Sequence, residues 1–162
     1  MKERYGDLID LAIAGEFDVI VHGCNCFCTM GNGIAKSIKH YFPMAYIADA
    51  ETTAGDKDKL GTYSSAVIEL ERDKRVVVVN AYTQYGYRRT GRNADYEAIE
   101  RVFAQIKHDF TGKRIGYPLI GAGLAGGDWS VIADIINAQL DQEDHTLVRL
   151  EREPAPQAGA RL

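Results

Sequence analysis

The chain has 162 residues, of which 46% are hydrophobic and 26% are charged, as expected for a single globular domain with a core of its own. Its net charge of −4 argues against a broad electrostatic footprint on nucleic acid, although backbone amides can bind a nucleotide without net positive charge. No apolar run approaches the ~20 residues that span a bilayer, and the N-terminus leads into no signal-peptide segment. We therefore expect no membrane association and a cytoplasmic location.

Short helices and strands are predicted along the first half of the chain, punctuated by Gly and Pro. Gly15 ends the first helix, Pro43 stops the second, and a polar turn at 71–74 joins two β-rich runs into a hairpin. The expected helices are 8–14, 34–42 and 44–54, and the expected strands are 18–22, 65–70 and 75–80.

The second half alternates helix and strand. A polar, aromatic loop at 82–93 precedes an amphipathic helix at 94–110, a strand at 114–119, a helix at 129–140 and a strand at 146–150. This alternation predicts an α/β fold with a mixed, mostly parallel sheet covered on both faces. We expect one domain over 1–150 and a frayed tail over 151–162, which is rich in Pro, Ala and Gly.

Two glycine-bearing loops stand where a predicted strand gives way to a predicted helix. Residues 22–35 read HGCNCFCTMGNGIA, and residues 118–129 read PLIGAGLAGGDW. Glycine lets main-chain N–H groups approach an anion, and the helix behind each loop adds a favourable dipole. Ligands of such sheets bind beyond the carboxyl ends of the strands. The pair of loops therefore predicts a ligand with two anionic or sugar parts, held mostly by backbone.

All three cysteines, Cys24, Cys26 and Cys28, fall in the first loop beside His22. Their odd number and close spacing argue against a disulfide framework. Structural zinc sites use wider spacing and a second ligand pair elsewhere, which this sequence lacks. We therefore predict no metal, and the cysteines are interpreted as small residues packing near a loop. A reactive thiolate stays an alternative that requires a suitable environment.

The order of these motifs resembles the macrodomain family. Besides the two glycine loops, the resemblance rests on Gly6-Asp7-Leu8 near the N-terminus and on NAYTQ at 80–84 after a predicted strand. It covers nearly the whole chain up to Leu150. It implies a three-layer α/β/α fold that binds ADP-ribose, and the branch it matches best processes ADP-ribose 1″-phosphate.

The resemblance also implies roles for individual residues. Asp7 would accept a hydrogen bond from the adenine amino group with Leu8 beside it, and Asn25 would contact the distal ribose. The residues lining that ribose and one phosphate would be Gly31, Gly33 and Ile34. The residues donating N–H groups to the diphosphate would be Gly121, Ala122, Gly123 and Leu124. Gln84 is included among the ligand-binding candidates.

Each candidate also has a purely structural interpretation. Asp7 and Asp128 are natural N-caps for the helices that follow them, and Asn25 is a typical turn residue. His22 ends a buried strand, where a histidine satisfied within the core is common. Gln84 is a candidate for orienting the loop that follows it.

Three chemical outcomes are open. The first is hydrolysis of the terminal phosphate of ADP-ribose 1″-phosphate, with His22, Asn25 and Asp128 as the nearest candidates for activating water, and no metal or cofactor. The second is release of ADP-ribose from a modified protein or nucleic-acid base. The third is binding without turnover, as a reader or scavenger that meets ADP-ribosylated macromolecules.

Departures from family patterns rank these outcomes. The branch that cleaves ADP-ribose from acidic side chains or DNA bases has a lysine after the threonine that corresponds to Thr83, whereas this chain has Gln84 there. That branch can also carry an aspartate where this chain has Ala125. The deacetylase-like branch shows more glycines after its asparagine motif than follow Asn25. The phosphatase-like branch therefore fits best.

Overall fold

Six strands form one sheet in the computed structural model, which describes residues 1–150. Their spatial order is β1-β6-β5-β2-β4-β3. All neighbouring pairs are parallel except β3 and β4, which form an antiparallel hairpin. The strands are β1 (Lys2–Tyr5), β2 (Val19–Cys24), β3 (Tyr63–Glu69), β4 (Arg75–Tyr82), β5 (Ile115–Tyr117) and β6 (His145–Arg149).

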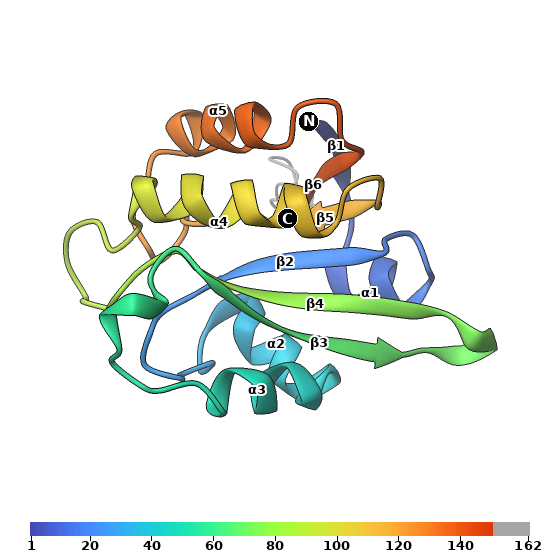
Figure 1. Cartoon of the computed structure of the whole chain (residues 1–162), viewed down its shortest axis with the longest axis horizontal. Helices are drawn as coiled ribbons and strands as arrows, with labels where there is room; N and C mark the ends of the chain where they lie inside the picture. Colours follow the sequence, from blue (N-terminus) through green and yellow to red (C-terminus); the bar gives the residue numbers. More distant parts are fainter. Residues whose placement is uncertain (151–162) are drawn as a thin grey trace, which may run out of the picture.

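Helices cover both faces of this sheet (Figure 1). Two helices pack together on one face, namely α4 (Tyr96–Asp109) and α5 (Trp129–Gln139). The opposite face carries α1 (Leu8–Ile13), α2 (Gly33–Tyr41) and α3 (Pro43–Ala50). Short 3₁₀ turns, η1 (Lys57–Lys59) and η2 (Glu71–Asp73), lie before and after β3. The expected three-layer α/β/α fold is therefore confirmed.

Two hydrophobic cores lie between the layers because the central strands are apolar on both faces. In β2, Val19 and Val21 pack against α4 and α5, whereas Ile20 packs against α1, α2 and α3. Val78 and Val79 of β4 divide between the two cores in the same way. Strands buried on both faces lack hydrophobic alternation in their sequence, which explains the continuous run VVVV at 76–79.

The predicted elements are all present, with boundaries shifted by a few residues. The hairpin around 71–74 is confirmed, and the helix predicted over 44–54 ends at Ala50. One strand is missing from the prediction, because β1 is exposed along its whole length and has no apolar pattern. The tail predicted over 151–162 lies outside the described residues. Within residues 1–150, no helix is long and apolar enough to cross a membrane.

Candidate functional site

The candidate site lies at the carboxyl edge of the sheet, where three loops meet. β2 lies between β5 and β4, and all three are parallel. Their carboxyl ends therefore lie side by side, and the loops 25–32, 83–95 and 118–128 leave from the same edge. In Figure 1 this edge is the left end of the molecule. The structure thus brings together the two glycine loops that lie far apart in the sequence.

The Asn25 side chain stabilises the conformation of the first loop, which leads into the N-terminus of α2. The Asn25 side chain accepts from the Phe27 N–H at 2.8 Å and donates to the Thr29 hydroxyl at 2.7 Å, which is the turn role considered for it from sequence. Gly33 adopts a φ of +56°, in the region that favours glycine. Asn32 precedes α2, and within residues 1–150 no side-chain cap hydrogen bond is made there, so in this part of the chain the first N–H groups of the helix stay free for an anion.

The second loop presents its backbone to solvent. Gly121 has a φ of +73°, and its carbonyl accepts from the Gly127 N–H at 2.7 Å, which closes the loop on itself. Among residues 1–150, the N–H groups of Gly123 and Leu124 find no acceptor. Leu124 in this loop is 82% exposed. A ligand lying on this loop would cover the leucine and use the free N–H groups.

The third loop fixes the position of the second. The N–H groups of Asn93 and Ala94 both donate to the Ala125 carbonyl, at 2.8 and 3.1 Å. Gln84 pairs with Ala94 in an isolated bridge, and its side-chain amide donates to the Gly86 carbonyl at 2.7 Å. Gln84 therefore orients its own loop, which is the structural role that the sequence left open for it.

Asp7 and Leu8 lie at the same edge but farther along the sheet. They follow β1, which is separated from β2 by β6 and β5. Three strand spacings correspond to roughly 14 Å, so a ligand touching both ends must be elongated. Asp7 is exposed and caps α1 by accepting from the Asp10 N–H at 2.9 Å, whereas Leu8 is buried in the core.

His22 is placed away from solvent, contrary to what a catalytic role requires. It is fully buried in β2, and its Nε2 lies 2.6 Å from the Asn80 side-chain oxygen. Burial lowers the pKa of His22 to about 4, so the ring is neutral at physiological pH. Asn80 in turn donates to the Ala45 carbonyl and the Ser64 hydroxyl. The core interpretation of His22 therefore fits the structure better than a catalytic one.

Asp128 ends the second loop and begins α5. Its carboxylate accepts from the Ser130 N–H at 2.9 Å and from the Ser130 hydroxyl at 2.8 Å. These hydrogen bonds lower the pKa of Asp128, so its exposed carboxylate is ionised at neutral pH. The N-cap role is present, and the carboxylate also faces solvent beside the loop.

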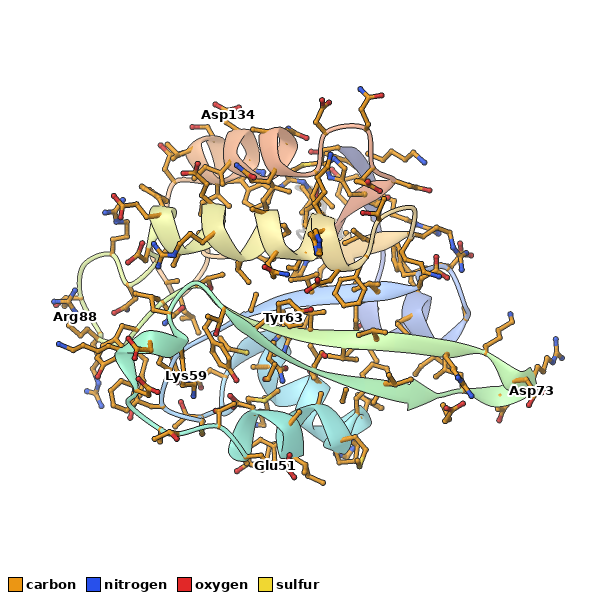
Figure 2. All side chains as sticks on the ribbon, in the orientation of Figure 1. Glu51, Lys59, Tyr63, Asp73, Arg88 and Asp134 are labelled. Carbon is orange, nitrogen blue, oxygen red and sulfur yellow. The ribbon has the colours of Figure 1, made fainter. Side chains whose placement is uncertain are left out.

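The structure shows residues near the site that received no role from sequence. Thr83 is buried, and its hydroxyl has no hydrogen-bond partner among residues 1–150. A Cβ on Gly23 would lie only 2.7 Å from this hydroxyl, so glycine is needed there. Three arginines, Arg88, Arg89 and Arg92, are exposed in the third loop, and Figure 2 shows Arg88 at the same end of the molecule. The run YRRTGR at 87–92 was the available signal for this local positive charge.

A surface depression of about 490 Å³ lies beside the first loop. Met30 and Gly31 line it together with Lys36, Lys39 and His40 of α2. It adds positive charge near the free N-terminus of α2. No group of three His, Cys, Asp or Glu side chains within 1–150 is arranged to hold a metal ion.

Comparison with known proteins agrees with this architecture. The family model named Macro domain matches residues 21–136. An uncharacterized 17.5 kDa protein of Enterobacteria phage T4 is 33% identical over 156 residues, covering 93% of this chain and 97% of the phage protein. An ADP-ribose 1″-phosphate phosphatase of Aspergillus oryzae is 44% identical over 46 residues, which are 28% of this chain and 21% of the fungal protein.

Solved structures share the fold at low sequence identity. The macrodomain of Mycobacterium tuberculosis DarG aligns with a TM-score of 0.68 at 20% identity, covering 94% of this chain and 97% of that one. Thermosipho africanus DarTG in complex with ADP-ribose aligns with a TM-score of 0.66 at 17% identity, covering 95% of this chain and 43% of that one. The Macro domain model matches more than half of this chain, and the sheet has the architecture of the DarG macrodomain. This chain therefore belongs to the Macro domain family.

Proposed function

We propose that this chain binds ADP-ribose across the carboxyl edge of its sheet. The observation that carries the proposal is the convergence of two backbone loops on neighbouring parallel strands, each with N–H groups free of partners among residues 1–150. Backbone N–H groups can bind a diphosphate even though the protein carries a net negative charge. The ADP-ribose complex of the structurally similar Thermosipho africanus protein supports this ligand.

In this arrangement the diphosphate lies between the two glycine loops. Gly121, Ala122, Gly123 and Leu124 face it from one side, and Gly31, Gly33 and Ile34 face it from the other. Asn25 holds the first loop and borders the distal ribose. Asp7 reaches the adenine with its second carboxylate oxygen, because its first oxygen already caps α1. The capping and binding roles of Asp7 are therefore compatible.

For activity, we propose hydrolysis of ADP-ribose 1″-phosphate to ADP-ribose and phosphate. The short match to the Aspergillus oryzae phosphatase supports this reaction. Water would attack the terminal phosphorus while the bond to the ribose oxygen breaks, and the loops would hold the substrate in line. Asp128 is ionised and exposed, so it is suited to orient the water. His22 is left out of this scheme because it is fully buried.

A second candidate function is binding without turnover, as a reader or scavenger of ADP-ribose. It is favoured by the engagement of the proposed catalytic side chains in structural hydrogen bonds. Asn25 folds its own loop, and Asp128 caps α5. Both candidates require the same ligand site and differ in whether phosphate is released.

Two measurements on one preparation separate the candidates. Calorimetry with ADP-ribose tests the binding site, and a phosphate-release assay with ADP-ribose 1″-phosphate tests turnover. We expect binding together with phosphate release, and we expect Asp128→Asn to lower the rate more than it weakens ADP-ribose binding. Binding of ADP-ribose without release of phosphate would support the function of a reader or scavenger. Absence of ADP-ribose binding would overturn both candidate functions.

A further inference from the structure

The third loop of the candidate site carries a positive charge that the proposed contacts to ADP-ribose do not use. Arg88, Arg89 and Arg92 lie in this loop, and the sequence has no Asp or Glu from 74 to 94, although the whole chain has a net charge of −4. Figure 2 shows Arg88 at the outer end of the molecule. Exposed arginines are often only solvated, and a binding role requires that at least one of them is held in place.

Arg92 is held in place through its side chain. The carbon at the centre of its guanidinium lies 4.0 Å from the centre of the Tyr96 ring, in a cation–π contact. The Tyr96 hydroxyl in turn accepts from the Asp128 N–H at 3.0 Å. One aromatic ring therefore connects the guanidinium to the start of α5, where the second glycine loop ends. The contact with the ring orders the arginine side chain without neutralising its charge.

The backbone at Arg92 is fitted to the second glycine loop as well. A Cβ on Gly126 would lie 3.0 Å from the Gly91 carbonyl oxygen and 3.5 Å from the Arg92 Cα, so the two loops pack backbone against backbone. The neighbouring Ala125 carbonyl accepts from the N–H groups of the two residues that follow Arg92. Both the main chain and the side chain of Arg92 are thus positioned by the loop proposed to bind the diphosphate.

The charge of Arg92 has no carboxylate partner in the described part of the chain. Within residues 1–150, no Asp or Glu lies within ion-pair distance of its guanidinium, which is exposed to solvent. Arg89 is also exposed, but among these residues it makes none of the contacts that hold Arg92. An ordered guanidinium without a carboxylate partner is suited to bind a phosphate through two parallel hydrogen bonds.

The order of the strands determines which part of an elongated ligand Arg92 can reach. Asp7 follows β1, the two glycine loops follow β5 and β2, and the third loop follows β4. β4 lies beyond β2 as seen from β1, at four strand spacings or roughly 19 Å. A ligand with its adenine at Asp7 and its diphosphate between the glycine loops therefore directs its other end, the distal ribose, towards the third loop.

We propose that Arg92 binds the terminal phosphate of ADP-ribose 1″-phosphate and so distinguishes this compound from ADP-ribose. The inference rests on the proposed ADP-ribose site, because that site sets the direction of the ligand. The terminal phosphate is attached to the distal ribose, and it is the only group by which the two compounds differ. The Arg92 guanidinium donates to its oxygens while Tyr96 holds the guanidinium. The backbone loops bind the part that both compounds share, and Arg92 supplies the specificity.

The test compares the two ligands on the same variants. Calorimetry measures the Kd of ADP-ribose and that of ADP-ribose 1″-phosphate, and the KM of the phosphate assay replaces the second Kd where phosphate is released. Arg92→Gln should weaken the interaction with ADP-ribose 1″-phosphate roughly tenfold and change the Kd of ADP-ribose by less than about twofold, because only the phosphorylated ligand loses a charge-assisted hydrogen bond. Arg92→Lys should restore part of the loss, because it keeps the charge without the planar fork.

Two controls separate a specific contact from diffuse attraction. Arg89→Gln removes the same charge from the same loop and should change the affinity for either ligand by less than about twofold, because solvent screens a charge that does not contact the ligand. Tyr96→Leu removes the ring that holds Arg92 and should reduce the preference for the phosphorylated ligand. Tyr96→Phe keeps the ring and should keep the preference. Melting temperatures show whether each variant is folded.

An unchanged affinity of Arg92→Gln for ADP-ribose 1″-phosphate would overturn the proposal, and so would equal weakening of both ligands. An equally large effect of Arg89→Gln would also overturn it, because the loop would then attract phosphate without a specific contact. Native protein that binds ADP-ribose with no preference for the 1″-phosphate would refute this inference and leave the ADP-ribose site intact. Native protein that does not bind ADP-ribose would refute the proposed function and this inference with it.

Discussion

At the scale of single residues, polar side chains that stood out in the sequence mostly turn out to support the backbone. His22 contacts Asn80, Asn25 folds its loop, and Asp7 and Asp128 cap helices. The sequence allowed each of these roles beside the functional one, because the residue types that bind ligands also cap helices and fold turns. Only contacts between distant segments, such as His22 with Asn80, separate the two interpretations.

The buried state of His22 predicts a pH dependence of stability. Its pKa is about 4 in the folded protein and 6.5 as the ordinary value, so below pH 6.5 the unfolded chain binds the proton more readily. The contribution of His22 to the free energy of unfolding is therefore fully present above pH 6.5 and decreases as the pH falls towards 4. Below pH 4 this group causes no further loss. The loss by pH 5 should be about 2 kcal/mol.

Urea unfolding at pH 7.5 and pH 5 measures this loss. His145 is also buried with its pKa lowered to about 4, so the native protein should lose the contributions of both histidines. His22→Gln should have a shallower pH dependence, whereas His40→Gln, at an exposed position, should follow the native protein. An unchanged dependence in His22→Gln would show that this ring does not couple folding to pH.

At the scale of elements, Asp128 at the start of α5 has two roles: it caps the helix, and in the proposed reaction its carboxylate orients the attacking water. Asp128→Ala removes the cap and should lower the melting temperature, whereas Asp128→Asn keeps the acceptor and the cap. If the carboxylate orients water, Asp128→Asn should retain native stability but release phosphate more slowly. Thermal unfolding and the phosphate assay together decide the matter. Phosphate release at the native rate by Asp128→Asn would show that Asp128 only caps the helix and has no role in the reaction.

The second glycine loop gives a sharper prediction. A Cβ at Gly123 would meet no atom of the described residues 1–150 within 4 Å, so substitution there should not disturb the fold. Gly123→Glu places a carboxylate beside the proposed diphosphate and should weaken ADP-ribose binding at least about 100-fold, because opposed like charges cost several kcal/mol.

Gly123→Ala is the matched control, since it adds a methyl group without charge. It should keep the melting temperature and most of the affinity measured by calorimetry. Full affinity in Gly123→Glu would mean that the loop does not contact the diphosphate.

An element can be predicted from the sequence when its own residues carry the hydrophobic pattern, and it cannot when it depends on contacts with distant residues. Local apolar patterns in the sequence predict β2, β4 and α4, and the observed positions of these elements agree with the predicted ones. β1 does not, because Lys2-Glu3-Arg4-Tyr5 is polar and exposed and forms a strand only by pairing with β6 near the other end of the described chain. The burial of Lys59 and Asp49 could not be predicted either, because their partners lie far away in the sequence: Lys59 donates to the Cys26 carbonyl, and Asp49 accepts from the Tyr82 hydroxyl.

At the scale of the whole molecule, the sheet order determines what kind of ligand can be recognised. β1 and β2 are 14 residues apart in the sequence, measured from Tyr5 to Val19, yet β6 and β5 lie between them in space. Asp7 and the glycine loops are therefore separated along one edge. A small anion would meet only one part of this edge, whereas an elongated nucleotide would meet both.

This separation predicts selectivity for ADP-ribose over its fragments. AMP can reach either the Asp7 end or the loops, so calorimetry should give a Kd at least roughly tenfold weaker than that for ADP-ribose, a difference of about 1.4 kcal/mol. Asp7→Ala should reduce binding of ADP-ribose but leave that of ribose 5-phosphate unchanged, because the fragment lacks adenine. Equal affinity for AMP and ADP-ribose would show that the second ribose is not recognised, and the ligand site would then be a general nucleotide site confined to one part of the sheet edge.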